Sequence, residues 1–144
     1  MSNYTPLKIL TIKIINKMKR EIKVSMPKDG YISWFVTTQN ALKTRVELRD
    51  EKGNLCFSEQ KKNESDTSID PPLAQGAGFI VGSNLSLTVE VETTSELKGR
   101  PVLYDITDDN GNIVGKNFTI ALEDYTDNDF NDIYVNIVGW YKKG

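Results

Sequence analysis

The chain has 144 residues, with 18 Lys and Arg against 20 Asp and Glu, a single cysteine and no histidine. This length fits one domain, 1–144, that can bury a core without disulfides, and the lone Cys56 excludes an internal disulfide framework. The absence of histidine removes Ser-His-Asp and Cys-His catalysis, His-bearing zinc sites and the commonest general base. The composition therefore disfavours an enzyme.

Residues 1–20 are interpreted as an N-terminal extension of this domain. The apolar stretch Leu7–Ile15 is broken by Lys8 and Lys13, is too short to span a bilayer, and precedes no small-residue cleavage site. We expect neither a signal peptide nor a transmembrane segment, and a protein that is cytoplasmic or released to the cell surface or exterior without a signal peptide. The basic residues interleave with Ile and Leu, which is typical of a solvated strand face, so no nucleic-acid partner is expected.

Alternation of apolar and polar residues recurs along the chain and predicts strands with one buried face. The predicted strands are Ile9–Ile15, Ile22–Met26, Tyr31–Val36, Arg45–Arg49, Leu85–Val91, Pro101–Ile106, Phe118–Leu122 and Ile133–Val138. No long stretch shows helical periodicity. Short strands, turn signals and the lack of helical patterns predict an all-β fold, an antiparallel β-sandwich of about nine strands.

The segments between these strands carry turn and loop signals. Asp50–Asn54 and Asp108–Asn112 contain Lys-Gly and Asn-Gly, which supply the positive φ of a tight hairpin turn. Glu59–Pro72 is polar and ends in two prolines, which predicts a long surface loop or an irregular edge. The glycines from Gly76 to Gly82 precede no Gly-Lys-Ser/Thr and no helix, so we interpret them as bends at the start of a strand rather than a phosphate loop.

The segment Glu123–Asp132 holds five carboxylates and two amides within ten residues. Gathered by a fold, five like charges raise one another's pKa values unless a positive ion lies between them. Hard oxygen ligands in this number favour Ca²⁺ over Zn²⁺ or copper, and exceed what one octahedral Mg²⁺ would use. The segment therefore predicts a calcium-binding loop between the last two predicted strands, where two ions would bring the local charge near neutral.

An EF-hand is disfavoured, because its loop needs Gly at the sixth position and Glu at the twelfth, where this chain has Asp132 and Val138. The flanks are also strand-like. Instead, Glu-Asp-x-Thr-Asp-Asn-Asp-aromatic-Asn-Asp, followed by an alternating strand, a Trp and a terminal Gly, resembles the bacterial calcium-dependent fucose/mannose-binding lectin II family. The resemblance is strongest from Asn117 to Trp140, with a weaker match at Gly99-Arg100-Pro101 and another at Met26-Pro27.

That resemblance implies a β-sandwich that dimerises and binds sugar hydroxyls directly through two adjacent calcium ions. The implied metal ligands are Glu123, Asp127, Asp129, Asn131 and Asp132, joined by Asn40 and by Gly144, whose carboxylate would complete a partner's site. The implied sugar-contacting positions are Asp124, Tyr125, Thr126 and Asp127. Tyr125 stands where the family has Gly, so it either stacks on the sugar or obstructs the pocket.

The chemistry of such a site is independent of the family. A hydrogen bond from a sugar hydroxyl merely replaces one to water and gains only ~1 kcal/mol. Calcium offers open coordination positions to ring hydroxyls, while the surrounding carboxylates accept their protons in charge-assisted hydrogen bonds. Only sugars with suitably placed neighbouring hydroxyls can chelate the ion.

The sequence therefore predicts a calcium-dependent lectin that binds fucose- or mannose-type glycans as a homodimer. The alternative is an adhesion or interaction module in which calcium only stabilises the sandwich. An enzyme ranks third: Glu123 and Asp127 could act on a glycosidic bond, but metal-bound carboxylates stay ionised and make poor general acids. Trp34 and Trp140 lie within strand patterns, which favours core or interface packing over sugar stacking.

Overall fold

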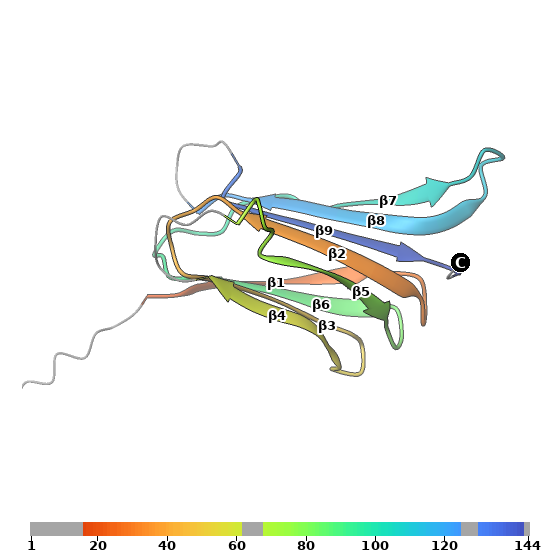
Figure 1. Ribbon diagram of the computed structural model, residues 1–144, viewed down its shortest axis with the longest axis horizontal. Helices are drawn as coiled ribbons and strands as arrows, with labels where there is room; N and C mark the ends of the chain where they lie inside the picture. The colour runs from red at the N-terminus through yellow and green to blue at the C-terminus, as the bar shows by residue number, and fades with distance from the viewer. Residues whose placement is uncertain (1–15, 62–67, 125–129, 143–144) are drawn as a thin grey trace, which may run out of the picture.

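The computed structural model describes residues 16–61, 68–124 and 130–142, which form two stacked antiparallel β-sheets (Figure 1). The strands are β1 (Met18–Ser25), β2 (Tyr31–Thr38), β3 (Thr44–Arg49), β4 (Leu55–Lys61), β5 (Ala74–Phe79), β6 (Asn84–Val91), β7 (Val102–Thr107), β8 (Ile113–Leu122) and β9 (Ile133–Trp140). The predicted all-β sandwich is confirmed. In the described ranges, no helix has the length and apolar character needed to cross a membrane.

The two sheets differ in size and strand order. One has four strands in the order β1-β6-β3-β4, and the other has five in the order β5-β2-β9-β8-β7. All of these strand pairs are antiparallel. Seven predicted strands coincide with β1, β2, β3, β6, β7, β8 and β9, while the predicted strand Ile9–Ile15 lies outside the described residues.

The core lies between the sheets and is built from the alternate residues that point inward. Val46, Leu48, Ile32 and Ile137 are among the side chains that are fully buried. Each such side chain stabilises the fold by about 1.5–3 kcal/mol through the hydrophobic effect. Trp34 packs against this core, as predicted by the first of the two alternatives, core or interface packing. Its ring stacks on that of Phe57 from the opposite sheet, with the ring centroids 5.3 Å apart.

Strands β4 and β5 differ from the sequence prediction. Of the two alternatives predicted for Glu59–Pro72, a surface loop or an edge, the start of the segment is an edge, because β4 continues to Lys61 as an edge strand. Gly76 and Gly78 do not mark a bend but lie inside β5. A Cβ on Gly76 would lie 2.6 Å from Cζ2 of Trp34, so glycine lets the indole ring of β2 lie over its neighbouring strand.

Both predicted hairpin turns are present. Gly53 and Gly111 have φ values of 84° and 81°, which explains the glycine in each turn. In each turn the leading aspartate, Asp50 or Asp108, accepts hydrogen bonds from backbone N–H groups two and four residues further on. The Asp50 carboxylate also reaches across to the Val81 N–H at 3.0 Å and is buried, so it ties two loops together.

Candidate metal site

Three strand ends meet at one end of the sandwich (Figure 1). Ile133, the first residue of β9, pairs with Leu122 at the end of β8 and with Thr38 at the end of β2. The backbone of Gln39 extends this pairing, because its N–H donates to the Asp132 carbonyl at 2.8 Å. The side chains just beyond these ends are therefore held close together.

Three carboxylates come together there. Glu123 and Asp124 follow β8, and Asp132 precedes β9; all three are buried. Each offers one carboxylate oxygen that lies within 4.8 Å of those of the other two, a spacing that could hold a metal ion. Three acids in one buried group repel one another strongly, because little solvent screens them.

Backbone N–H groups fix two of these side chains. The Asp124 N–H donates to Oδ2 of Asp132 at 2.9 Å, and the Phe130 N–H donates to Oε2 of Glu123 at 3.0 Å. Burial raises the pKa of the Asp132 carboxyl, and the adjacent Asp124 raises it further. These bonds orient the oxygens but bring in no positive charge.

The segment that leads into Gly99-Arg100-Pro101 pairs with the chain at the end of β8 and so helps to position the three carboxylates. The backbones of Lys98 and Glu123 exchange two hydrogen bonds, at 2.8 and 3.0 Å. A Cβ on the next residue, Gly99, would lie 2.3 Å from the carbonyl oxygen of Ala121. Glycine thus permits the close approach that holds the end of β8 in place.

Asn40 reaches the carboxylates from the connection between the two sheets. Its Nδ2 donates to Oδ2 of Asp124 at 2.7 Å and to Oγ1 of Thr44 at 2.9 Å. The Thr44 hydroxyl in turn donates to the carbonyl of Leu42 at 3.0 Å. From β4, the buried ammonium of Lys61 donates to the carbonyl of Asn40. Asp124 and Thr44 therefore fix where the Asn40 amide points, and Lys61 holds the backbone of Asn40.

Three buried oxygens at this end have no hydrogen-bond partner within the described ranges: Oδ1 of Asp124, Oδ1 of Asn40 and Oγ1 of Thr38. An unsatisfied buried polar group costs about 1–3 kcal/mol, so such atoms are rare without a reason. The two Oδ1 atoms belong to side chains that are hydrogen-bonded to each other and sit beside two more carboxylates. A hard cation bound by the three carboxylates would neutralise their charge, and the oxygen-only donor set fits calcium.

The structure brings together some of the residues that the sequence singles out. Glu123, Asp124, Asp132 and Asn40 meet in one buried group, whereas Asn131 lies exposed beside it. The remaining predicted site residues are Asp127, Asp129, Tyr125, Thr126 and Gly144, and these lie outside the described residues. The individual ligand and sugar-contacting roles stay predictions.

Sequence reasoning missed several supporting residues. It gave Asp124 a sugar contact only, but the structure includes its carboxylate in the potential metal group. It also missed Thr38, Thr44 and Lys61. Lys61 carries a readable signal, because it shares the inward-facing alternation of Phe57 in β4, where a lysine requires a buried polar partner.

No protein-family model and no curated protein matches the chain in sequence. Solved structures do match in fold. The Chromobacterium violaceum lectin CV2L, in complex with alpha-methyl-fucoside, has a TM-score of 0.58 and 15% identity over 85% of this chain and 96% of its own. The C-terminal domain of the Burkholderia cenocepacia lectin BC2L-C has a TM-score of 0.62 and 19% identity over 88% and 100%. The Ralstonia solanacearum high-affinity mannose-binding lectin has a TM-score of 0.59 and 15% identity over 85% and 96%.

The chain shares the fold of these bacterial lectins. Each match covers almost the whole of the lectin or lectin domain, so the likeness extends to the complete sandwich. The family resemblance inferred from the acidic motif is therefore confirmed at the level of the fold. Identities of 15% to 19% do not carry over a ligand.

Proposed function

We propose that this protein is a calcium-dependent lectin that binds fucose- or mannose-type glycans and catalyses no reaction. The observation that carries the proposal is the buried group of Glu123, Asp124 and Asp132, together with the buried Oδ1 atoms of Asp124 and Asn40, which have no hydrogen-bond partner among the described residues. The group lies in a fold shared with lectins described as bound to alpha-methyl-fucoside and as mannose-binding.

The donor set favours calcium over other cations. It offers carboxylate and amide oxygens without any imidazole, because the chain has no histidine, and Cys56 lies on β4 outside the group. Zinc and copper prefer nitrogen or sulfur ligands, whereas calcium takes six to eight oxygens in a flexible arrangement. Three acids in contact also call for a divalent rather than a monovalent ion.

We assign the carboxylates of Glu123, Asp124 and Asp132 and the side-chain oxygen Oδ1 of Asn40 to binding the cation. When bound, calcium would supply open coordination positions for neighbouring sugar hydroxyls. The carboxylates of the chain would orient those hydroxyls by accepting their protons in charge-assisted hydrogen bonds. Lys61 and Thr44 would keep the Asn40 segment in the position that the site requires.

The proposal extends to residues known only from the sequence motif. Asp127, Asp129 and Asn131 would add ligands, Tyr125 and Thr126 would contact the sugar, and the Gly144 carboxylate of a second copy would complete the site. A homodimer accords with weak monosaccharide binding, because two sites on one particle multiply the effective concentration at a glycan-bearing surface.

Isothermal titration calorimetry tests the proposal in two steps. Calcium is titrated into EDTA-treated, dialysed protein, and then methyl α-fucoside, methyl α-mannoside and methyl α-galactoside are titrated with calcium or with EDTA. We expect calcium binding, followed by fucoside or mannoside binding that EDTA abolishes. If calcium binds but no glycan on an array does, the alternative of a structural calcium module stands. If calcium does not bind, the proposal is refuted.

A further inference from the structure

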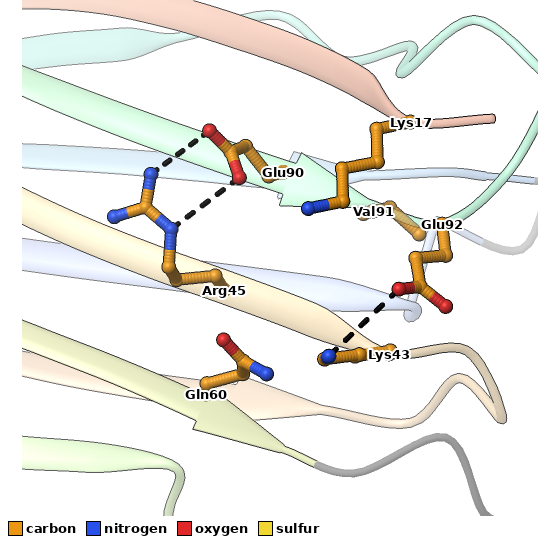
Figure 2. Close-up of a pocket in the computed structure, with 7 residues that line it drawn as sticks. All are labelled: Lys17, Lys43, Arg45, Gln60, Glu90, Val91 and Glu92. Atoms are coloured by element: carbon orange, nitrogen blue, oxygen red, sulfur yellow. Dashed lines mark hydrogen bonds and ion pairs between the residues drawn. The ribbon is translucent and has the colours of Figure 1, made fainter. Parts of the chain in front are cut away.

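Two arginines of the four-stranded sheet differ in how their charge is matched. Arg45 lies on the outward face of β3, where Figure 2 shows its guanidinium beside Glu90. Its Nη2 and Nε donate to the two carboxylate oxygens of Glu90 at 2.9 and 3.4 Å, and its Nη1 lies 3.2 Å from Oε1 of Glu47. Lys43 and Glu92 pair nearby, with Nζ and Oε1 3.9 Å apart. The chain itself therefore balances the charge of Arg45.

Arg20 lies on β1 of the same sheet but faces the other way. Ile22 and Val24 belong to the core and Met18 packs against it, so the alternation of the strand places Arg20 on the inner side. Its Nη1 donates to the carbonyl of Leu97, in the connection between β6 and β7, at 3.1 Å. Within the described ranges Arg20 has no carboxylate partner and no other hydrogen bond. The remaining N–H groups of its guanidinium are therefore open to a ligand.

A cleft opens beside Arg20. It has a volume of about 510 Å³ and is lined by residues 18–20 of β1 and residues 96–99 of the connection between β6 and β7. Clefts of about 300–1,000 Å³ are the usual size for small-molecule sites. The cleft lies at the same end of the sandwich as the candidate metal site (Figure 1), because the backbone of Lys98 pairs with that of Glu123. Its lining is nevertheless separate, since it includes none of the three acids of that site.

The charges that line the cleft are mixed but positive in sum. Lys98 is exposed, and among the described residues its side chain forms no ion pair or hydrogen bond. Lys19 is already paired, with its Nζ 3.2 Å from Oε1 of Glu21. Glu96 is the acid of the lining, and it also lacks a side-chain partner in the part of the chain that the structure describes. Arg20 and Lys98 thus offer two unmatched positive charges against the single negative charge of Glu96.

We propose that this cleft binds a sugar acid, that is, a sugar with a carboxylate beside its hydroxyl groups. The Arg20 guanidinium presents parallel N–H groups that match the two oxygens of a carboxylate, and Lys98 adds a second positive charge. The Glu96 carboxylate accepts the protons of ring hydroxyls, which a plain inorganic anion lacks. One negative charge on the ligand balances the sum of these three groups, whereas a phosphorylated sugar carries nearly two. A free sugar acid and a uronic acid residue of a polysaccharide share this chemistry.

An NMR titration of the isotopically labelled chain in EDTA tests the cleft while the proposed calcium site takes no part. The probes are methyl β-glucuronide and trigalacturonate, and methyl β-glucoside is the neutral counterpart of the first. We expect an acidic probe to bind and to shift the amide signals of residues 18–20 and 96–99, while the glucoside leaves them in place. Binding of the glucuronide supports a free sugar acid as the ligand, and binding of trigalacturonate alone supports an acidic polysaccharide.

Variants of the two unmatched bases test their roles. Arg20→Met and Lys98→Met should each weaken binding of the acidic probe by about tenfold or more, because each removes charge-assisted hydrogen bonds. Arg45→Met is the matched control, since Glu90 already balances the charge of this arginine on the same sheet. It should leave the affinity unchanged.

Circular dichroism melts establish that each variant is folded, and the exposed Lys98 keeps the test valid if Arg20→Met does not fold. The inference is overturned if neither acidic probe binds, if the glucoside binds as tightly as the glucuronide, or if the folded variants bind like the wild type. Acetate that binds as tightly as the glucuronide also overturns it, because the hydroxyl groups would then play no part. An acidic probe that binds while calcium and neutral glycans fail to bind would support the cleft and refute the lectin proposal.

Discussion

Two buried aspartates at opposite ends of the sandwich are satisfied in different ways. Asp50 follows β3, and its carboxylate accepts bonds from the N–H groups of Lys52, Asn54 and Val81 and from Nδ2 of Asn54, at 2.9–3.0 Å. Asp124 follows β8, and only its Oδ2 has a hydrogen-bond partner among the described residues; its Oδ1 is buried without one.

The difference shows which carboxylate the described residues leave incompletely satisfied. Burial raises the pKa of Asp50, but the hydrogen bonds from Val81 and Asn54 outweigh burial, so its pKa lies below the ordinary value. The fold alone therefore keeps Asp50 ionised. Around Asp124 the described residues supply other acids instead of a full set of donors, which is the arrangement expected for the proposed cation ligand.

The largest expected effect is on thermal stability, from a substitution at the end of the sandwich that holds Glu123, Asp124 and Asp132. Asp124→Asn keeps an oxygen that can accept from Asn40 but removes one charge from the acidic group. A ligand that binds only the native state adds ~2.7 kcal/mol at a hundredfold excess over its Kd. Asp124→Asn should lose most of that calcium-dependent gain, and in EDTA it should unfold at a higher temperature than the wild type, because the buried acids repel less.

Differential scanning calorimetry in calcium and in EDTA measures both effects. Asp108→Asn is the control, because Asp108 occupies an exposed turn and should leave the response to calcium unchanged. A variant at Asp124 that gains as much from calcium as the wild type would falsify the assignment of Asp124 to the cation.

The second prediction concerns the opposite end of the sandwich, called here the turn end, where Asp50 begins the hairpin turn Asp50–Asn54. Asp50→Ala removes four accepted hydrogen bonds and leaves the Val81 N–H without its partner, which should lower the free energy of unfolding by about 2–3 kcal/mol. Asp108→Ala, in the same turn pattern at the surface, should cost far less, because water replaces the lost acceptor. Urea unfolding compares the two. Equal losses would show that burial at Asp50 has no energetic weight.

Much of the fold was predictable from the sequence because alternation and turn glycines are local signals. The acidic segment was also predictable, since its ligand-type residues are adjacent in the chain. Strand β4 was not, because Phe57 is its only buried apolar residue, Leu55 is exposed and Ser58, Glu59 and Gln60 are polar. Strand β5 was hidden by glycines whose reason, the Trp34 ring, lies on another strand.

The completeness of the site depends on contacts between distant parts of the chain. Asn40 and Asp124 are 84 residues apart and meet only because β2 and β8 flank β9. Lys61 reaches Asn40 from the opposite sheet. A local sequence pattern identifies the acids. It does not identify the Asn40 amide or the Lys61 ammonium, because strand order brings these groups to the site.

A third prediction uses pH to test how the fold stabilises the ionised form of Asp50. Because the folded pKa of Asp50 lies below its unfolded value, Asp50 contributes stability above the unfolded pKa, and this contribution is lost as pH falls through the folded pKa. Asp50→Asn should therefore show a smaller loss of stability on acidification than the wild type. Urea unfolding in EDTA at several acidic pH values measures it, and parallel curves would contradict the prediction.

The smallest expected effect is on the single thiol, which lies near the turn end. Burial, with a smaller contribution from the negative charge of Asp50, raises the pKa of Cys56 to about 11. Since only the thiolate reacts, alkylation by iodoacetamide should be slow at neutral pH and accelerate up to about pH 11. Asp50→Asn should move this profile downward by a small amount, because burial is the larger cause and remains. Asp108→Asn should leave the profile in place if the Asp50 charge is what Cys56 senses. A shift of the same size in both variants would mean that the thiol responds to local opening of the fold, so the measurement is made well below the melting temperature of each variant.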